Sequence, residues 1–170
     1  DSIGLVGVVS SLNRGTDIGG KTINGPTGFL IGVGANPGAV NPERELSRLE
    51  AKVRAGAEFV ITQPVFDVRR LEGFLDAVSG LHIPVIAGLW PLVSLRNAEF
   101  MNNEVPGASV PDGIMDRMRK AQDRGPEEAR EEGVRIARET LAAVKPLVQG
   151  VQISPPLGRY DLALRVLEGF

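Results

Sequence analysis

Six polar or aromatic residues stand at, or just beyond, the points where the apolar runs of this sequence are expected to end as strands. Gln63 directly follows the run 59–62, whose β-branched and aromatic residues are typical of a parallel strand covered on both faces. Parallel α/β folds place their chemistry at the carboxyl ends of such strands. We therefore expect Gln63 to lie near five further residues: Asn36, Trp90, Asn97, Ser154 and Arg159.

This set is rich in amide groups and poor in groups that titrate near neutral pH. No Ser-His-Asp triad is possible around His82, the only histidine, and no pair of carboxylates stands at the expected strand ends. Such residues favour binding a polar, heteroaromatic, anionic ligand over transferring protons. Arg159 can hold a carboxylate through its guanidinium, and an anion there would also offset the helix dipole, which opposes a cation at a helix start. If the reaction is redox, a bound cofactor must supply the electrons.

A second polar set lies on the helix expected from Pro42 to about Ala55. Asn41 is a good N-cap, and proline is favoured at the first helical position. Apolar residues recur at helical spacing and form a buried stripe, and one residue earlier the same spacing gives a polar stripe of Glu45, Arg48 and Lys52. Spacing alone indicates that the polar stripe is an exposed face with ion pairs.

The elements that must position these residues alternate along the chain. Residues 3–12 are apolar and fit either a helix or a strand, and strands are expected over 29–33, 59–62, 83–89 and 150–153. Helices are expected between them, with Asp67 and Ser94 as N-caps and with Pro111 and Pro126 as starting residues. Alternation of this kind predicts an α/β fold with a parallel sheet.

The number of units limits the architecture. Four strand–helix units are half of a (β/α)8 barrel, which typically needs about 250 residues, and this chain has 170. The sequence therefore predicts either a small open α/β domain or a part of a barrel.

Composition excludes several classes of function. The net charge is −2 without a basic block, so we expect no nucleic-acid partner. The chain has no cysteine, which removes disulfides and thiolate chemistry, and one histidine cannot form a His-rich metal centre. No apolar run is long enough to span a bilayer and no signal peptide is visible, so we expect a cytoplasmic protein without a membrane partner.

Four segments closely resemble methylenetetrahydrofolate reductase, and most closely the reductase half of the bifunctional homocysteine S-methyltransferase/methylenetetrahydrofolate reductase proteins. The resemblance implies a (β/α)8 barrel that binds FAD and reduces 5,10-methylenetetrahydrofolate to 5-methyltetrahydrofolate with NAD(P)H. The segments are GANPGA, AKVRAGAEFVITQPVFD, GLWPLVSLRNAEFMNNEVPG and GVQISPPLGRYDLALRVLEGF.

The resemblance also implies roles for single residues. Gln63, Asn97 and Arg159 match positions that contact the folate substrate. The polar stripe matches the helix that holds the FAD, which reverses its interpretation as an exposed face, and Lys52 would contact phosphate. The residues implied to bind the cofactor are Asn36, Glu45, Arg48 and Lys52.

The resemblance further implies that residues 1–170 form the carboxyl-terminal half of the barrel. The catalytic acid of the family lies before the point that matches Asp1, so we expect no catalytic residue in this chain and no turnover by the fragment alone. A half barrel leaves strand edges unpaired, so we also expect self-association.

Two other hypotheses remain open at this stage. One is a flavin-free, pterin-handling transferase or lyase on a similar barrel, which would not bind FAD. The other is a non-catalytic half barrel, whose unfolding midpoint would not shift with any ligand.

Overall fold

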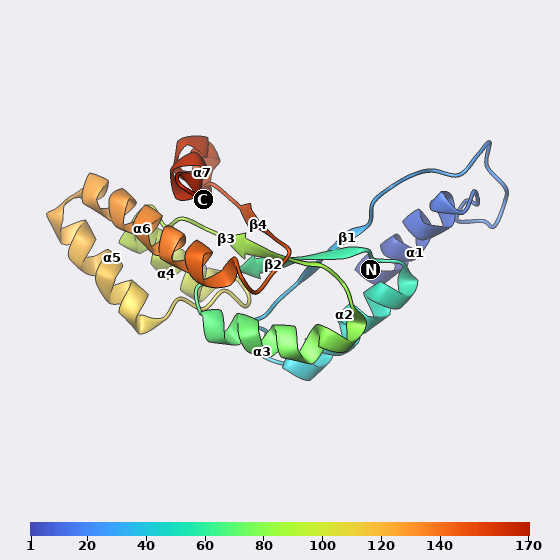
Figure 1. Cartoon of the computed structure of the whole chain (residues 1–170), viewed down its shortest axis with the longest axis horizontal. Helices are drawn as coiled ribbons and strands as arrows, with labels where there is room; N and C mark the ends of the chain where they lie inside the picture. Colours follow the sequence, from blue (N-terminus) through green and yellow to red (C-terminus); the bar gives the residue numbers. More distant parts are fainter.

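The computed structural model describes residues 1–170, apart from the side chain of Leu157. Four strands form one parallel sheet in the order β1-β2-β3-β4, with helices between them (Figure 1). The α/β class and the parallel pairing expected from the sequence are thus confirmed. The elements are α1 (Ser2–Asn13), β1 (Gly32–Ala35), α2 (Pro42–Ala55), β2 (Phe59–Pro64), α3 (Val68–Val78), η1 (Ser79–Leu81), β3 (Val85–Leu89), α4 (Leu95–Glu104), α5 (Asp112–Arg124), α6 (Pro126–Val144), β4 (Gly150–Ile153), η2 (Pro156–Gly158) and α7 (Tyr160–Leu167).

One face of the sheet carries the core. Successive strand residues point to opposite faces, and Val33, Val60, Val85 and Ala87 are all buried. They pack against apolar side chains of α1, α2, α3, α6 and α7, among them the fully buried Leu49. Consecutive parallel strands joined by right-handed crossovers place their helices on one face. Figure 1 shows α2 and α3 along that side of the strands.

The opposite face is much more open. The register places Gly34, Ile61, Ile86 and Gly150 in one row across the four strands. Gly34 is exposed, whereas Ile61, Ile86 and Gly150 are half-buried. Space therefore remains above this row, and a Cβ added at Gly34 would meet no atom within 4 Å.

The helices begin and end at capping residues that can be recognised in the sequence. Asn41, Asp67 and Ser94 each accept a hydrogen bond from a backbone N–H of the first turn of α2, α3 and α4. Gly56 ends α2 in the left-handed conformation, with a φ of 119°. The N-cap predictions at Asn41, Asp67 and Ser94 are confirmed, as is the start of α6 at Pro126.

The first predicted strand is wrong in its bounds. Residues 29–33 were expected to form it, whereas β1 spans Gly32–Ala35. The side chain of Asn13 bonds both the N–H and the C=O of Phe29, and Glu58 accepts from the N–H of Ile31. Phe29 is therefore satisfied outside the ladder, and only the C=O of Ile31 reaches the start of β2, where it accepts from the N–H groups of Glu58 and Phe59.

The apolar segment near the start is a helix. Of the two alternatives for residues 3–12, the structure has α1, which carries no charged residue. Val6 is its only fully buried residue, and Leu5 is 64% exposed. None of the described helices is both long enough and apolar enough to cross a lipid bilayer.

Candidate functional site

Gln63 lies where the sequence predicted it, at the carboxyl end of β2. It is the fifth residue of this six-residue strand, and its side chain is exposed beside the buried Thr62. The parallel register brings the ends of all four strands to the same edge, so Asn36, Trp90 and Ser154, which follow β1, β3 and β4, lie along it too. The structure thus brings the residues that directly follow these strands to one edge, and their joint role as a binding site stays a prediction.

Helix α2 binds the carboxyl end of β1 through two of its polar residues. Lys52 donates from Nζ to the carbonyl oxygen of Gly34 over 2.7 Å, and Glu45 accepts from the backbone N–H of Asn36 over 2.9 Å. Arg48 reaches Ser2 of α1, with 3.4 Å between Nη2 and Oγ. Three side chains of one helix face therefore converge on the first strand and its neighbour α1.

This arrangement corrects the interpretation from spacing alone. Lys52 is only 8% exposed, and Glu45 and Arg48 are half-buried, so the stripe is not an exposed face. Within the described part of the chain, none of the three forms an ion pair with another. Helical spacing could not show this, because the burial arises from β1 and not from the helix.

Asn36 also ties the end of β1 to a segment far along the chain. Its Nδ2 donates to the carbonyl oxygen of Pro106 over 3.3 Å, and its Oδ1 accepts from Gly38 over 2.9 Å. Gly107 follows with a φ of 83°, and a side chain there would overlap the Asn36 amide. The loop after α4 is therefore held at the carboxyl end of β1, a contact that nothing in the local sequence indicated.

Asn97 supports the turn between β3 and α4. Its Oδ1 accepts from the indole N–H of Trp90 over 3.3 Å and from the N–H of Val93 over 3.4 Å. The amide Nδ2 forms no hydrogen bond within the described chain, so it is the part of Asn97 that a ligand can use. Trp90 is half-buried and packs with the core beneath α4, in agreement with a packing role.

Arg159 lies just before α7 and has a partner of its own. Its guanidinium donates from Nε and Nη2 to the two carboxylate oxygens of Asp161, each over 3.1 Å. The hydrogen bonds from Arg159 hold the pKa of Asp161 below its usual value. The anion expected to offset the helix dipole is therefore present in the chain itself, and a ligand carboxylate would have to compete with Asp161 for Arg159.

Sequence reasoning missed two polar residues at this edge, Gln152 and Thr62. Gln152 of β4 shares a face of the strand with the predicted Ser154, two residues on, and its Nε2 donates to Ser154 Oγ over 2.8 Å. Thr62 is 5% exposed and makes two hydrogen bonds beside Gln63. Threonine in a strand also fits plain β-propensity, so only its polar hydroxyl in an otherwise apolar run could have indicated a role.

Hollows of different size lie near the carboxyl edge and at the opposite edge of the sheet. The hollow among Pro37, Phe66 and Gly107 has a volume of about 20 Å³, which is room for one water molecule. A larger hollow of about 500 Å³ lies at the opposite edge, beside His82 and Gln149, away from every residue considered above. A third hollow, of about 240 Å³, lies between α2 and α3 and is lined by two of the predicted cofactor residues, Asn36 and Glu45.

Comparison with known proteins identifies the family. The sequence profile of Methylenetetrahydrofolate reductase matches residues 26–153, which include all four strands. The chain belongs to the methylenetetrahydrofolate reductase family. The resemblance seen in the sequence is confirmed at that level, and a bifunctional parent stays a prediction.

Two relatives show how much of such a protein is present here. Methylenetetrahydrofolate reductase 1 of Schizosaccharomyces pombe is 30% identical over 118 residues, which are 64% of this chain and 19% of that protein. A solved structure, an uncharacterized protein from Clostridium thermocellum that binds two copies of 5-methyl-5,6,7,8-tetrahydrofolic acid, covers 82% of this chain at 22% identity and a TM-score of 0.53. This chain covers 51% of that structure. The chain thus spans 19% of the first relative and about half of the second, and the second likeness shows the fold alone.

The family match does not reach every site residue. Asn36, Glu45, Arg48, Lys52, Gln63 and Asn97 lie within residues 26–153, whereas Arg159 lies outside them. The family match therefore covers the first six positions and not Arg159, and the binding roles of all seven residues stay predictions.

Proposed function

We propose that residues 1–170 are the carboxyl-terminal half of a (β/α)8 barrel that reduces 5,10-methylenetetrahydrofolate to 5-methyltetrahydrofolate with FAD and NAD(P)H. One observation carries the proposal: the family match spans the strands whose carboxyl ends gather Asn36, Gln63 and Trp90 at one edge. The known chemistry of the family needs polar groups of this kind around a flat, anionic substrate.

The half-barrel architecture is supported by strand order and by size. Strands that follow one another in space as they do in sequence, with helices on one face, are the arrangement of a barrel segment, whereas doubly wound sheets reverse their order. The chain covers 51% of a solved structure with a TM-score of 0.53. Both β1 and β4 keep one edge unpaired within the described sheet, as a barrel segment would.

The substrate residues are Gln63, Asn97 and Arg159. A glutamine amide can both donate to and accept from the amide-like edge of a pterin, and Gln63 is exposed for that purpose. Asn97 offers its Nδ2, and Arg159 offers a guanidinium that can bind the carboxylates of a folate. The solved structure that shares this fold binds a methylated tetrahydrofolate, which agrees with a folate substrate here.

The residues on α2 fit FAD. Lys52 is buried, and within the described chain its ammonium has a carbonyl partner but no carboxylate, so a nearby phosphate would compensate a charge that is costly to bury alone. On the opposite, uncovered face of the sheet, a Cβ at Gly34 would meet no atom within 4 Å. Asn36, Glu45, Arg48 and Lys52 would hold the cofactor, which supplies hydride transfer when bound.

The chain itself supplies binding and orientation in this proposal. We assign no catalytic acid to it, because the carboxylates near the carboxyl edge already have partners: Glu45 accepts from the backbone of Asn36, and Asp161 accepts from Arg159. Turnover then needs the other half of the barrel, and the isolated chain is proposed to be inactive and to self-associate through its open edges.

The test is a titration of the chain with FAD, followed by flavin fluorescence, beside Lys52→Ala. The control is Lys120→Ala, which removes an exposed lysine from α5. We expect saturable binding that Lys52→Ala weakens about tenfold or more and that Lys120→Ala leaves unchanged. Strong binding that does not respond to Lys52 would contradict the assignment of α2.

The same titration separates the other two hypotheses. A flavin-free transferase or lyase would bind 5-methyltetrahydrofolate without binding FAD. A non-catalytic half barrel would bind neither, and its unfolding midpoint would stay the same with each ligand added.

A further inference from the structure

Strand β2 is irregular at the place where it presents Gln63. Ile61 lies opposite Ile86, and the next aligned pair is Pro64 with Gly88. Three steps along β2 therefore match two steps along β3, which defines a β-bulge with one extra residue. Bulges often occur beside functional sites, where they redirect a side chain.

The bulge changes which residues reach the core. In a regular strand Thr62 and Pro64 would face the core, and Gln63 and Val65 would face the open side. Here Thr62 and Val65 are both buried, at 5% and 6% exposure, and Gln63 between them is exposed. The extra residue thus lets the chain bury Val65 while it keeps Gln63 out of the core.

The hydroxyl of Thr62 replaces the ladder hydrogen bond that the bulge disrupts. Gly88 donates its N–H to Thr62 Oγ1 over 2.9 Å, and this hydroxyl donates to the carbonyl oxygen of Gln63 over 2.8 Å. Regular pairing resumes at once, because Val65 donates to the carbonyl oxygen of Gly88 over 2.9 Å. A hydroxyl can fill this place because it donates and accepts at the same time.

Gly88 leaves the space that the bulge needs. A Cβ at this position would lie 2.4 Å from the carbonyl oxygen of Thr62 and 3.4 Å from the backbone of Gln63. Contacts with backbone atoms cannot be relieved by a change of rotamer, so a side chain at residue 88 would push the bulge away. Thr62 and Gly88 therefore fix the backbone of Gln63 from two sides.

We propose that Thr62 and Gly88 are positioning residues that hold the β-bulge and thereby set the direction in which Gln63 meets its ligand. Neither residue touches the ligand in this proposal. The identity of the ligand, a reduced folate, rests on the proposed function, whereas the bulge and its hydrogen bonds do not depend on it.

The experiment compares Thr62→Val, which removes the hydroxyl and keeps the shape, with Thr62→Ser, which keeps the hydroxyl. The matched control is Thr140→Val, because Thr140 is also buried, at 8% exposure, and its hydroxyl donates to Ile136 within α6, away from the site. Gln63→Ala gives the loss of ligand affinity that is expected when the Gln63 side chain is absent.

The first measurement needs no ligand. We expect the backbone amide of Gly88 to exchange its hydrogen equally slowly in the wild type, in Thr62→Ser and in Thr140→Val, because Thr62 Oγ1 accepts from it. In Thr62→Val this exchange should be at least tenfold faster than in Thr140→Val. An unchanged exchange rate of the Gly88 amide in Thr62→Val would overturn the proposal.

The second measurement is the affinity for 5-methyltetrahydrofolate by calorimetry. We expect Gln63→Ala to weaken binding at least tenfold, Thr62→Val at least fivefold, and Thr62→Ser and Thr140→Val less than twofold. Wild-type affinity in Thr62→Val, or equal losses in Thr62→Val and Thr140→Val, would overturn the positioning role.

Two further results are possible: the wild type does not bind folate, or the Thr62→Val variant does not fold. If the wild type binds no folate, the proposed function fails for this chain, and the hydrogen-exchange measurement alone decides the positioning role. If Thr62→Val does not fold, Thr62→Ala is measured in its place, because it lacks the same hydroxyl and adds no methyl group against Gly88.

Discussion

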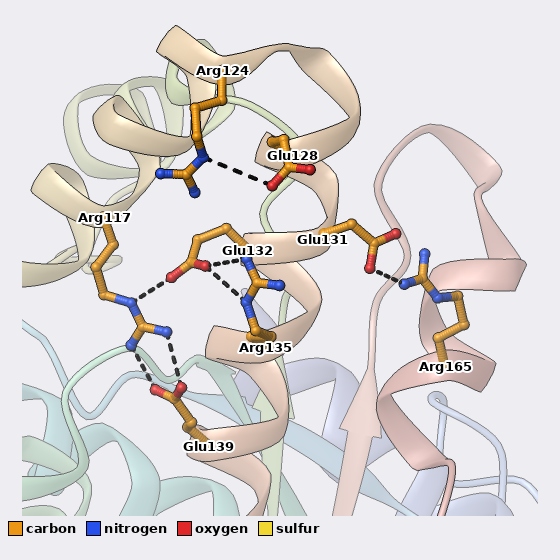
Figure 2. A network of polar contacts seen from close by, with 8 residues as sticks. All are labelled: Arg117, Arg124, Glu128, Glu131, Glu132, Arg135, Glu139 and Arg165. Carbon is orange, nitrogen blue, oxygen red and sulfur yellow. Dashed lines mark hydrogen bonds and ion pairs between the residues drawn. The ribbon is translucent and has the colours of Figure 1, made fainter.

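The guanidinium of Arg117 on α5 donates two hydrogen bonds to the carboxylate of Glu139 on α6, over 2.6 and 2.9 Å (Figure 2). Its Nε donates to Glu132 over 2.6 Å, and Arg135 binds the second oxygen of the same carboxylate. Glu132 is 9% exposed, so this network joins the extra helix α5 to the long helix α6 through a largely buried carboxylate. On the far side of α6, Glu131 pairs with Arg165 of α7 (Figure 2).

Arg117→Met should lower the free energy of unfolding by about 1–2 kcal/mol, because it removes three charge-assisted hydrogen bonds whose partners are partly solvated. Urea unfolding measures the change. The control is Arg119→Met on the same helix, where the pair with Asp116 is exposed on both sides and the loss should stay below about 0.5 kcal/mol. Equal losses in both variants would show that the network adds nothing beyond an ordinary surface pair.

The same network makes stability depend on pH. Burial alone would raise the pKa of Glu132, but hydrogen bonds from Arg117 and Arg135 outweigh it and hold the pKa below the usual value. The hydrogen bonds from Arg117 likewise lower the pKa of Glu139. A carboxyl whose pKa is lowered by folding stabilises the folded state above its unfolded pKa of about 4.3, and this contribution is lost as the pH falls through the folded pKa.

We therefore expect the wild type to lose stability below about pH 5 more steeply than Arg117→Met does. Urea midpoints measured between about pH 3 and pH 7 test this. The difference between the two proteins should be largest near neutral pH and should shrink as the acid protonates both carboxyls. A constant difference over the whole range would contradict the lowered pKa values.

Gly107→Ala should destabilise the loop that Asn36 holds at the end of β1. The added Cβ would overlap the Asn36 amide, and the φ of 83° is unfavourable for alanine. Gly20→Ala is the matched control, because Gly20 has a φ of 77° and open space around it, so only the backbone cost of about 1 kcal/mol applies. We expect Gly107→Ala to cost at least about 1 kcal/mol more.

A double-mutant cycle identifies the cause of that excess. Removing the Asn36 side chain first should relieve the overlap, so Gly107→Ala should cost less in an Asn36→Ala background. Strictly additive losses would show that the two residues do not interact.

Self-association should depend on the surface beside β1. The side chains of Leu5, Phe29 and Leu30 line an apolar hollow of about 260 Å³ at this edge of the sheet, and Leu30 is 72% exposed. We expect light scattering to give a mass above 18.1 kDa at concentrations well above micromolar, and Leu30→Lys to shift the chain toward monomer. Val40→Lys, at a loop residue that is 99% exposed, should leave the mass unchanged. A monodisperse wild-type monomer would refute self-association.

Local signals in the sequence determined much of the fold. Caps at Asn41, Asp67 and Ser94, the left-handed Gly56, and the apolar runs that became β2, β3 and β4 are readable because each depends on residues within one turn or one strand. The position of Gln63 at the carboxyl end of β2 followed from the same signals, because it comes directly after the apolar run 59–62.

The tertiary structure decided what these signals leave open. Lys52 is buried because β1 lies against it, β1 begins at Gly32 because β2 begins at Phe59, and Asn36 meets Pro106 across 70 residues of sequence. The bulge at Thr62 exists only in the pairing of β2 with β3. Sequence periodicity reports the faces of one element, whereas burial, strand register and hydrogen-bond partners depend on which second element packs against it.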